Sequence, residues 1–133
     1  MDPRAFYEQL VSQIDDGDVR MVAQVMLSHV GEKNLITLED LARHAFGKYN
    51  ESTERKTRLV LAKLVTDHHM PIGAYSGKAG RWLCADEEEL GRVIMDLTAR
   101  HNETGNRIHS LRLSKVPPKE PKFEKAVQNS LWS

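Results

Sequence analysis

The chain has 133 residues, 40% of them hydrophobic and 6% aromatic, with 19 basic side chains, 19 acidic side chains and one cysteine. This length suits one ordinary domain with an aliphatic core, and a single cysteine excludes an internal disulfide. The apolar stretches are far shorter than the roughly 20 residues of a membrane span, and the N-terminus lacks the apolar region of a signal peptide. We therefore expect a cytoplasmic protein without a membrane partner.

The first two predicted elements are helices. Asp2 and Pro3 are suited to a helix start, and a short helix within residues 1–17 is expected to bury Phe6, Leu10 and Ile14. Asp18 is then predicted to cap a second helix that ends at Gly31. Its spacing of apolar residues predicts the buried stripe Val19, Val22, Met26 and Val30.

Two further helices are predicted after a linker over residues 32–36. Thr37 is expected to cap the first of them, which runs to about Phe46 and stops at Gly47. Its inward residues are predicted to be Leu38, Leu41, Ala42 and Ala45. Ser52 or Thr53 caps the next helix, which extends to about Asp67. Its first half, residues 54–58, is almost wholly polar, and its apolar residues lie in the second half, at Val60, Leu61, Leu64 and Val65.

The pattern then changes to two short strands, residues 71–75 and 81–85, joined by a Gly- and Ser-rich turn that favours a hairpin. Asp86 is predicted to cap a long helix over residues 87–113, whose first turn is acidic. Apolar and polar residues recur along it at alternating steps of four and three, which is a heptad pattern. These residues are Leu90, Ile94, Leu97, His101, Thr104, Ile108 and Leu111. A proline-rich basic tail, with an amphipathic segment from Phe123 to Trp132, follows.

Three short helices followed by a hairpin are the element order of a winged helix-turn-helix, here over residues 18–85. The predicted fold class is therefore mainly α with a small β-hairpin, in which residues 1–17 form an N-terminal helix. The helix over residues 86–113 serves dimerisation or partner docking, and residues 114–133 are a tail. A polar first half suits a recognition helix, which inserts its first turns into the DNA major groove.

Charge is distributed in blocks that favour a DNA partner despite the zero net charge. Residues 43–85 carry eight basic and three acidic side chains, whereas residues 1–42 carry three basic and eight acidic ones. A local positive patch, and not the total charge, attracts phosphates. The predicted DNA-binding residues are Lys48, Ser52, Thr53, Arg55, Lys56, Arg58, Lys78 and Arg81. The alternative is that Arg55, Lys56 and Arg58 form a solvated face with pairs such as Glu54–Arg58.

From about Leu35 to Leu111 the chain resembles the small winged-helix proteins of bacteriophages and related mobile elements. The resemblance depends on the step Pro71-Ile72 and on the stretch from Gly80 to Leu90, where a glycine–aromatic strand leads into an acidic helix start. It implies a DNA-binding fold with a role in transcription or replication control, and a host-cell cytoplasmic location.

No pattern in the sequence points to an enzyme, a cofactor or a metal. His68 and His69 lack the partners that a zinc site needs, and Cys84, in an apolar strand, is expected to be a buried thiol. The sequence around Lys78 lacks the spacing of a phosphate-binding loop.

Two functional hypotheses follow. The protein is either a double-stranded DNA-binding regulator, or a phage-type factor that docks on a host machine such as RNA polymerase. Because the long helix is too long for the core to cover, we also expect a homodimer or partner interface. It would comprise Leu97, His101, Thr104, Ile108 and Leu111. The competing hypothesis is that Gly105 breaks the helix and its second half folds back.

Overall fold

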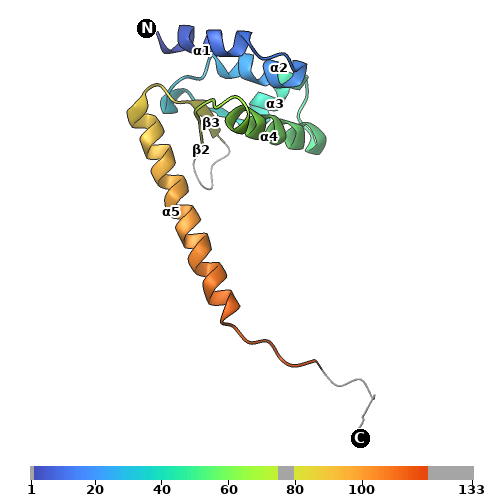
Figure 1. The fold of residues 1–133 in the computed structure, drawn as a ribbon. Coiled ribbons are helices and arrows are strands. Elements are labelled where there is room, and N and C mark those ends of the chain that lie inside the picture. Colours follow the sequence, from blue (N-terminus) through green and yellow to red (C-terminus); the bar gives the residue numbers. More distant parts are fainter. Residues whose placement is uncertain (1, 75–79, 120–133) are drawn as a thin grey trace, which may run out of the picture. The chain divides into compact units, whose positions relative to one another are not determined.

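The computed structural model describes residues 2–74 and 80–119, and the chain divides into two units with the boundary between Ala99 and Arg100. The protein is mainly helical, with a small three-stranded antiparallel sheet (Figure 1). The helices of the first unit are α1 (Pro3–Ser12), α2 (Gly17–Met26), the 3₁₀ helix η1 (Glu32–Asn34), α3 (Leu38–Phe46) and α4 (Glu51–Thr66). The strands are β1 (Ile36–Thr37), β2 (Ile72–Ala74) and β3 (Gly80–Leu83). Helix α5 (Glu87–Arg112) begins in the first unit and ends in the second.

Three of the predicted helix caps are correct, two at helix starts and one at a helix end. The Thr37 hydroxyl accepts a hydrogen bond from the Asp40 amide at 3.1 Å, and Gly47 ends α3 with a left-handed φ of 82°. The Asp86 carboxylate likewise accepts from the Glu89 amide at 2.8 Å at the start of α5. Side-chain oxygens at these positions satisfy amides that have no partner within the helix.

Two other caps lie upstream of the predicted residues. Asp16, and not Asp18, caps α2, because its carboxylate accepts from the amides of Asp18 and Val19. Helix α2 also ends at Met26, well before the predicted stop at Gly31. Asn50, and not Ser52 or Thr53, caps α4 through a reciprocal capping box with Thr53. In both cases several adjacent residues have side-chain oxygens that are able to cap a helix, so the sequence leaves the choice open.

The core of the first unit is formed by one face of each helix α1 to α4, together with β1 and β3. The buried stripe of α1 is Tyr7 and Val11, followed by Ile14, and not the predicted Phe6, Leu10 and Ile14. Phe6 is 49% exposed. Both sets of residues have helical spacing, so the spacing alone does not decide between them. In the structure α1 is oriented so that the Tyr7 hydroxyl donates a hydrogen bond to the backbone carbonyl of Cys84.

The sheet has the strand order β1-β3-β2, so it contains one strand more than the predicted hairpin. Ile36, predicted as linker, and Thr37, predicted as a helix cap, pair with Arg81 and Gly80. Gly73 pairs with Trp82, whose ring lies so close that a Cβ on Gly73 would come within 2.4 Å of it. The absence of a side chain at Gly73 therefore allows Trp82 to be buried on the sheet, where it is 1% exposed.

Helix α5 is continuous through Gly105, so the predicted alternative of a break and fold-back there is wrong. Near its start, Val93 is buried against Trp82 and Cys84. Ile94 and Leu97, which follow Val93 along the helix, are 53% and 52% exposed. In the second unit, the described residues 101–119 are all exposed, and residues 114–119 form no helix or strand. The segment predicted from Phe123 to Trp132 lies outside the described residues. No helix in the described part of the chain is long and apolar enough to cross a membrane.

Candidate nucleic-acid interface

Helix α4 contacts the rest of the first unit along its whole length, through one face. Its buried residues are Thr53, Thr57, Val60, Leu61 and Leu64. Thr57 is fully buried, and its hydroxyl donates to the Thr53 carbonyl at 2.7 Å, so no polar atom of that side chain needs water. The surface of α4 that remains exposed is mixed and basic, with Ser52, Arg55, Arg58, Leu59, Ala62 and Lys63. The prediction of a freely protruding first half is therefore only partly correct.

Thr53 does not belong to this exposed surface. It is 7% exposed, and its hydroxyl both accepts from the Asn50 amide and lies within hydrogen-bond distance of the Asn50 carbonyl. The predicted DNA-binding role of Thr53 is therefore corrected to a structural one. A capping threonine and a base-contacting threonine are the same residue type, so the sequence does not distinguish them.

Lys56 is turned back toward its own domain. Its ammonium lies 3.1 Å from the Asp18 carboxylate on α2 and 4.8 Å from the ring centre of Phe46 on α3. Both partners are remote in the sequence. Lys56 thus joins three helices, and its charge is partly compensated within the protein.

The remaining predicted residues of this region are exposed. Lys48, Ser52 and Arg55 lie at the turn before α4 and on its first turns. Within residues 2–74 and 80–119, Arg55 takes part in no ion pair, which leaves its guanidinium available for a ligand. Arg58 approaches Glu54 only at 4.0 Å and is 58% exposed. The solvated pair Glu54–Arg58 therefore exists, but it is loose.

Arg58 and Arg81 line the same groove between α4 and the sheet. The groove has a volume of about 250 Å³, and its apolar lining residues include Leu61, Val65 and Ile72. Arg81 is half-buried, and its guanidinium donates to the Gly80 carbonyl at 3.0 Å. Burial lowers the pKa of Arg81, and the charge of Arg58 lowers that pKa further. The fold therefore holds two like charges close together at one surface groove. Lys78, the other predicted contact of the hairpin, lies outside the described residues.

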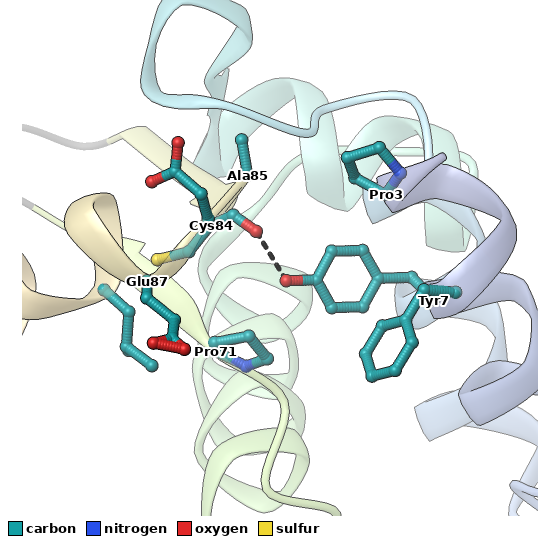
Figure 2. Close-up of a pocket in the computed structure, with 9 residues that line it drawn as sticks. Pro3, Tyr7, Pro71, Cys84, Ala85 and Glu87 are labelled. Atoms are coloured by element: carbon teal, nitrogen blue, oxygen red, sulfur yellow. Dashed lines mark hydrogen bonds between the residues drawn. The ribbon is translucent and has the colours of Figure 1, made fainter. Parts of the chain in front are cut away.

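A second concavity, of about 440 Å³, lies between α1, Pro71 and the junction of β3 with α5 (Figure 2). Tyr7 points into it and donates a hydrogen bond to the Cys84 carbonyl. Cys84 is 2% exposed, and burial, with smaller contributions from the charges of Glu89 and Asp86, raises the pKa of its thiol to about 11. The thiol is therefore protonated at neutral pH and is a weak nucleophile.

The described residues contain no group of three or more His, Cys, Asp and Glu side chains that could hold a metal ion. The predicted interface residues of α5 are exposed: Leu97, His101, Thr104, Ile108 and Leu111.

Sequence reasoning missed the capping role of Asn50, although an Asn three residues before a Thr is a recognisable signal. It also missed that Arg58 and Arg81 line the same groove, which no local pattern indicates. Comparisons with protein-family models, curated proteins and solved structures gave no match to this chain.

Proposed function

We propose that this protein is a winged helix-turn-helix that binds double-stranded DNA, catalyses no reaction, and acts in transcription or replication control. In this proposal α3 and α4 are the helix-turn-helix, α4 is the recognition helix, and β2 and β3 form the base of the wing. The three-stranded sheet and the order of the elements support this assignment. The proteins that it would resemble are the small winged-helix proteins of bacteriophages and related mobile elements.

The groove shared by Arg58 and Arg81 carries the proposal. Burial and then the charge of Arg58 lower the pKa of the half-buried Arg81, so the two like charges repel each other in the free protein, and a phosphate placed between them would relieve that repulsion. The exposed Lys48, before α4, extends the same positive character. Phosphate contacts of this kind fix the position of a protein on the duplex without reading its sequence.

Sequence would be read by the first turns of α4. The major groove, about 12 Å wide, admits an α-helix, and Ser52 and Arg55 are among the polar side chains that α4 exposes there, together with Glu51 and Lys56. A guanidinium without an ion-pair partner is suited to paired hydrogen bonds with guanine O6 and N7. We therefore assign base contacts to Arg55 and Ser52, and phosphate contacts to Lys48, Arg58, Arg81 and, from the sequence, Lys78.

The test is a titration of the full chain with labelled duplexes of random and genomic sequence at two salt concentrations. With four phosphate contacts, the affinity should fall about a hundredfold between about 50 and 200 mM salt. Lack of binding at the lower salt concentration, or an affinity that is insensitive to salt, would contradict the proposal. Inhibition by a general polyanion such as heparin should show the same salt dependence.

A homodimer through α5 is the arrangement that we propose for the bound protein. The seam residues Leu97, His101, Thr104, Ile108 and Leu111 are exposed along a helix that carries no break. A two-fold dimer would cover these residues and place two recognition helices on one duplex, about one helical turn or a multiple apart.

The second candidate function is that of a protein-docking factor. It is favoured by the exposure of large apolar residues on α5, where Met95 is 72% and Leu111 is 65% exposed. In that case α5 would bind a host machine such as RNA polymerase. Salt-sensitive DNA affinity separates the two functions, because a docking factor needs none.

A further inference from the structure

We propose that Leu59 recognises the C5-methyl group of a thymine, so that the DNA site of this protein contains a thymine next to the base pair read by Arg55. This inference rests on the proposed function, because it assigns a specificity to the same helix.

Leu59 is the most exposed large apolar residue of α4, ahead of Val65, which is 43% exposed near the end of the helix. Leu59 is 63% exposed, whereas Val60, Leu61 and Leu64 are at most 5% exposed. An isolated exposed leucine is common on protein surfaces, so its exposure alone decides nothing. The position of Leu59 is more informative, because the helical repeat places it one turn after Arg55 and one turn before Ala62 and Lys63. Leu59 therefore lies in the middle of the exposed surface of the proposed recognition helix.

The surroundings of Leu59 select a polyanion over an apolar protein partner. Arg55, Arg58 and Lys63 are all exposed on the same side of α4. A protein that covered Leu59 would also have to remove water from these three cations or supply a carboxylate for each, and lysine is depleted from protein interfaces whereas arginine is enriched there. Along DNA the same cations gain phosphates or base acceptors.

Within the major groove, the methyl group of thymine is the apolar feature of the base-pair edges. Residues one helical turn apart have Cβ atoms about 5–6 Å apart, which corresponds to between one and two base-pair steps of about 3.4 Å. If Arg55 contacts one base pair, Leu59 lies over the next one or two. Burying the thymine methyl against Leu59 would remove apolar surface on both molecules from water.

The experiment first selects a preferred duplex from a random library with the wild-type full-length chain. Each thymine of that duplex is then replaced singly by deoxyuridine, which lacks the methyl group and keeps the base-pairing edge. We expect the affinity of the wild type to fall about fourfold at one or two adjacent positions, the effect of about one buried methyl group. Leu59→Ala should bind the thymine duplex correspondingly more weakly and should respond to none of the replacements. Met21→Ala, at a side chain that is 40% exposed on α2, is the matched control and should keep the wild-type response.

The outcomes are distinguishable. If the wild type binds DNA with the expected salt dependence but is insensitive to every deoxyuridine, this inference is wrong and the proposed function stands. If Leu59→Ala retains the sensitivity to deoxyuridine, another residue reads the methyl group and the assignment to Leu59 is overturned. If no duplex is bound at low salt, the proposed function fails and the inference fails with it. Circular dichroism should show both variants folded, because both side chains lie at the surface.

Discussion

Helices α4 and α5 are the two longest in the described chain, and they use their apolar residues in opposite ways. Helix α4 has 16 residues, of which five are buried within its own unit. Helix α5 has 26 residues, and Val93 is the one buried residue among them. The side of α4 that remains exposed is mainly polar and cationic, whereas α5 exposes apolar side chains at Ile94, Met95, Leu97, Ile108 and Leu111.

The apolar face of α4 is thus covered within its own unit, whereas most apolar side chains of α5 are not. Tertiary packing of an apolar face supplies most of the stability of a protein helix. Helix α4 has that packing, so its exposed cations are carried by a helix that is fixed on the core. Helix α5 has it only near its start, and the proposed dimer would cover the remaining apolar residues. The predictions below test each half of this comparison.

The largest effect is expected at Ile108. Burial of an isoleucine side chain contributes about 1.5–3 kcal/mol, and a two-fold dimer contains two copies. Ile108→Asp should therefore weaken dimerisation by more than about a hundredfold, measured by sedimentation across the micromolar range. Asn106→Asp is the control, since it adds the same charge on the opposite side of the helix. A wild-type chain that sediments as a monomer, unchanged by Ile108→Asp, would end the dimer proposal and leave α5 for a foreign partner.

The next effect concerns the cations that line the groove beside α4. Arg58→Ala combined with Arg81→Ala should weaken DNA binding by about ten- to a hundredfold at low salt and flatten the salt dependence by about two units. The loss should be similar for all sequences, because phosphates carry no sequence information. Arg4→Ala combined with Arg20→Ala changes the net charge equally on α1 and α2 and should have little effect. An equal loss in this control would mean that total charge, and not the groove, drives binding.

Much of the architecture is predictable from the sequence because local signals agree with the packing. Thr37 and Gly47 delimit α3, and the buried residues Leu38, Leu41, Ala42 and Ala45 follow the helical period. The mainly helical class and the long helix from Glu87 are correct for the same reason. In these segments the caps and the apolar spacing are compatible with only one set of helix boundaries and one buried face.

Prediction from the sequence fails where a strand, a buried face or a side-chain contact depends on residues far away along the chain. Strand β1 has two residues, too few to show an alternating pattern, and it exists because Gly80 and Arg81 pair with it. Either Phe6 or Tyr7 could begin a buried stripe on α1, and the carbonyl of Cys84 favours Tyr7. For the candidate site, Arg55 and Lys56 are both basic residues at the start of a helix. Only the positions of Asp18 and Phe46 show that Lys56 is engaged within the protein.

The neighbours Arg55 and Lys56 provide a matched pair within α4. Arg55→Ala should reduce DNA affinity by about 1–3 kcal/mol and relax the specificity at one base pair. Lys56→Ala should change DNA affinity little and lower the free energy of unfolding by at most about 1 kcal/mol, because its ion pair with Asp18 is half exposed. Asp18→Asn should reproduce the part of this loss that comes from the ion pair, because it leaves the contact of Lys56 with Phe46 in place. A loss of affinity in Lys56→Ala that equals that of Arg55→Ala would place the ammonium back in the interface.

A smaller effect is expected at the beginning of α5, where the core holds the chain through Tyr7. Tyr7→Phe removes the hydroxyl that bonds to the Cys84 carbonyl, three residues before α5. A buried carbonyl left without its donor costs about 1–3 kcal/mol, so urea unfolding should show a loss in that range. DNA affinity should be unchanged, because the pocket around Tyr7 and the groove around Arg81 share no lining residue.

A loss of stability at alkaline pH is expected at the same two residues, Tyr7 and Cys84. Burial, as the main cause, raises the pKa of Tyr7 from 10.0 to about 12 and that of Cys84 from 9.0 to about 11. The folded protein therefore holds both protons more tightly than the unfolded chain does. This contribution to stability is complete below about pH 9 and is lost as the pH rises from 9 to 12. The free energy of unfolding, measured in urea across this range, should fall less steeply between pH 9 and 11 in Cys84→Ala than in the wild type. Tyr7→Phe should remove the part of the fall between pH 10 and 12. Lysines titrate in the same range, so each variant is compared with the wild type. Parallel curves for all three proteins would show that the fold raises the pKa of neither group.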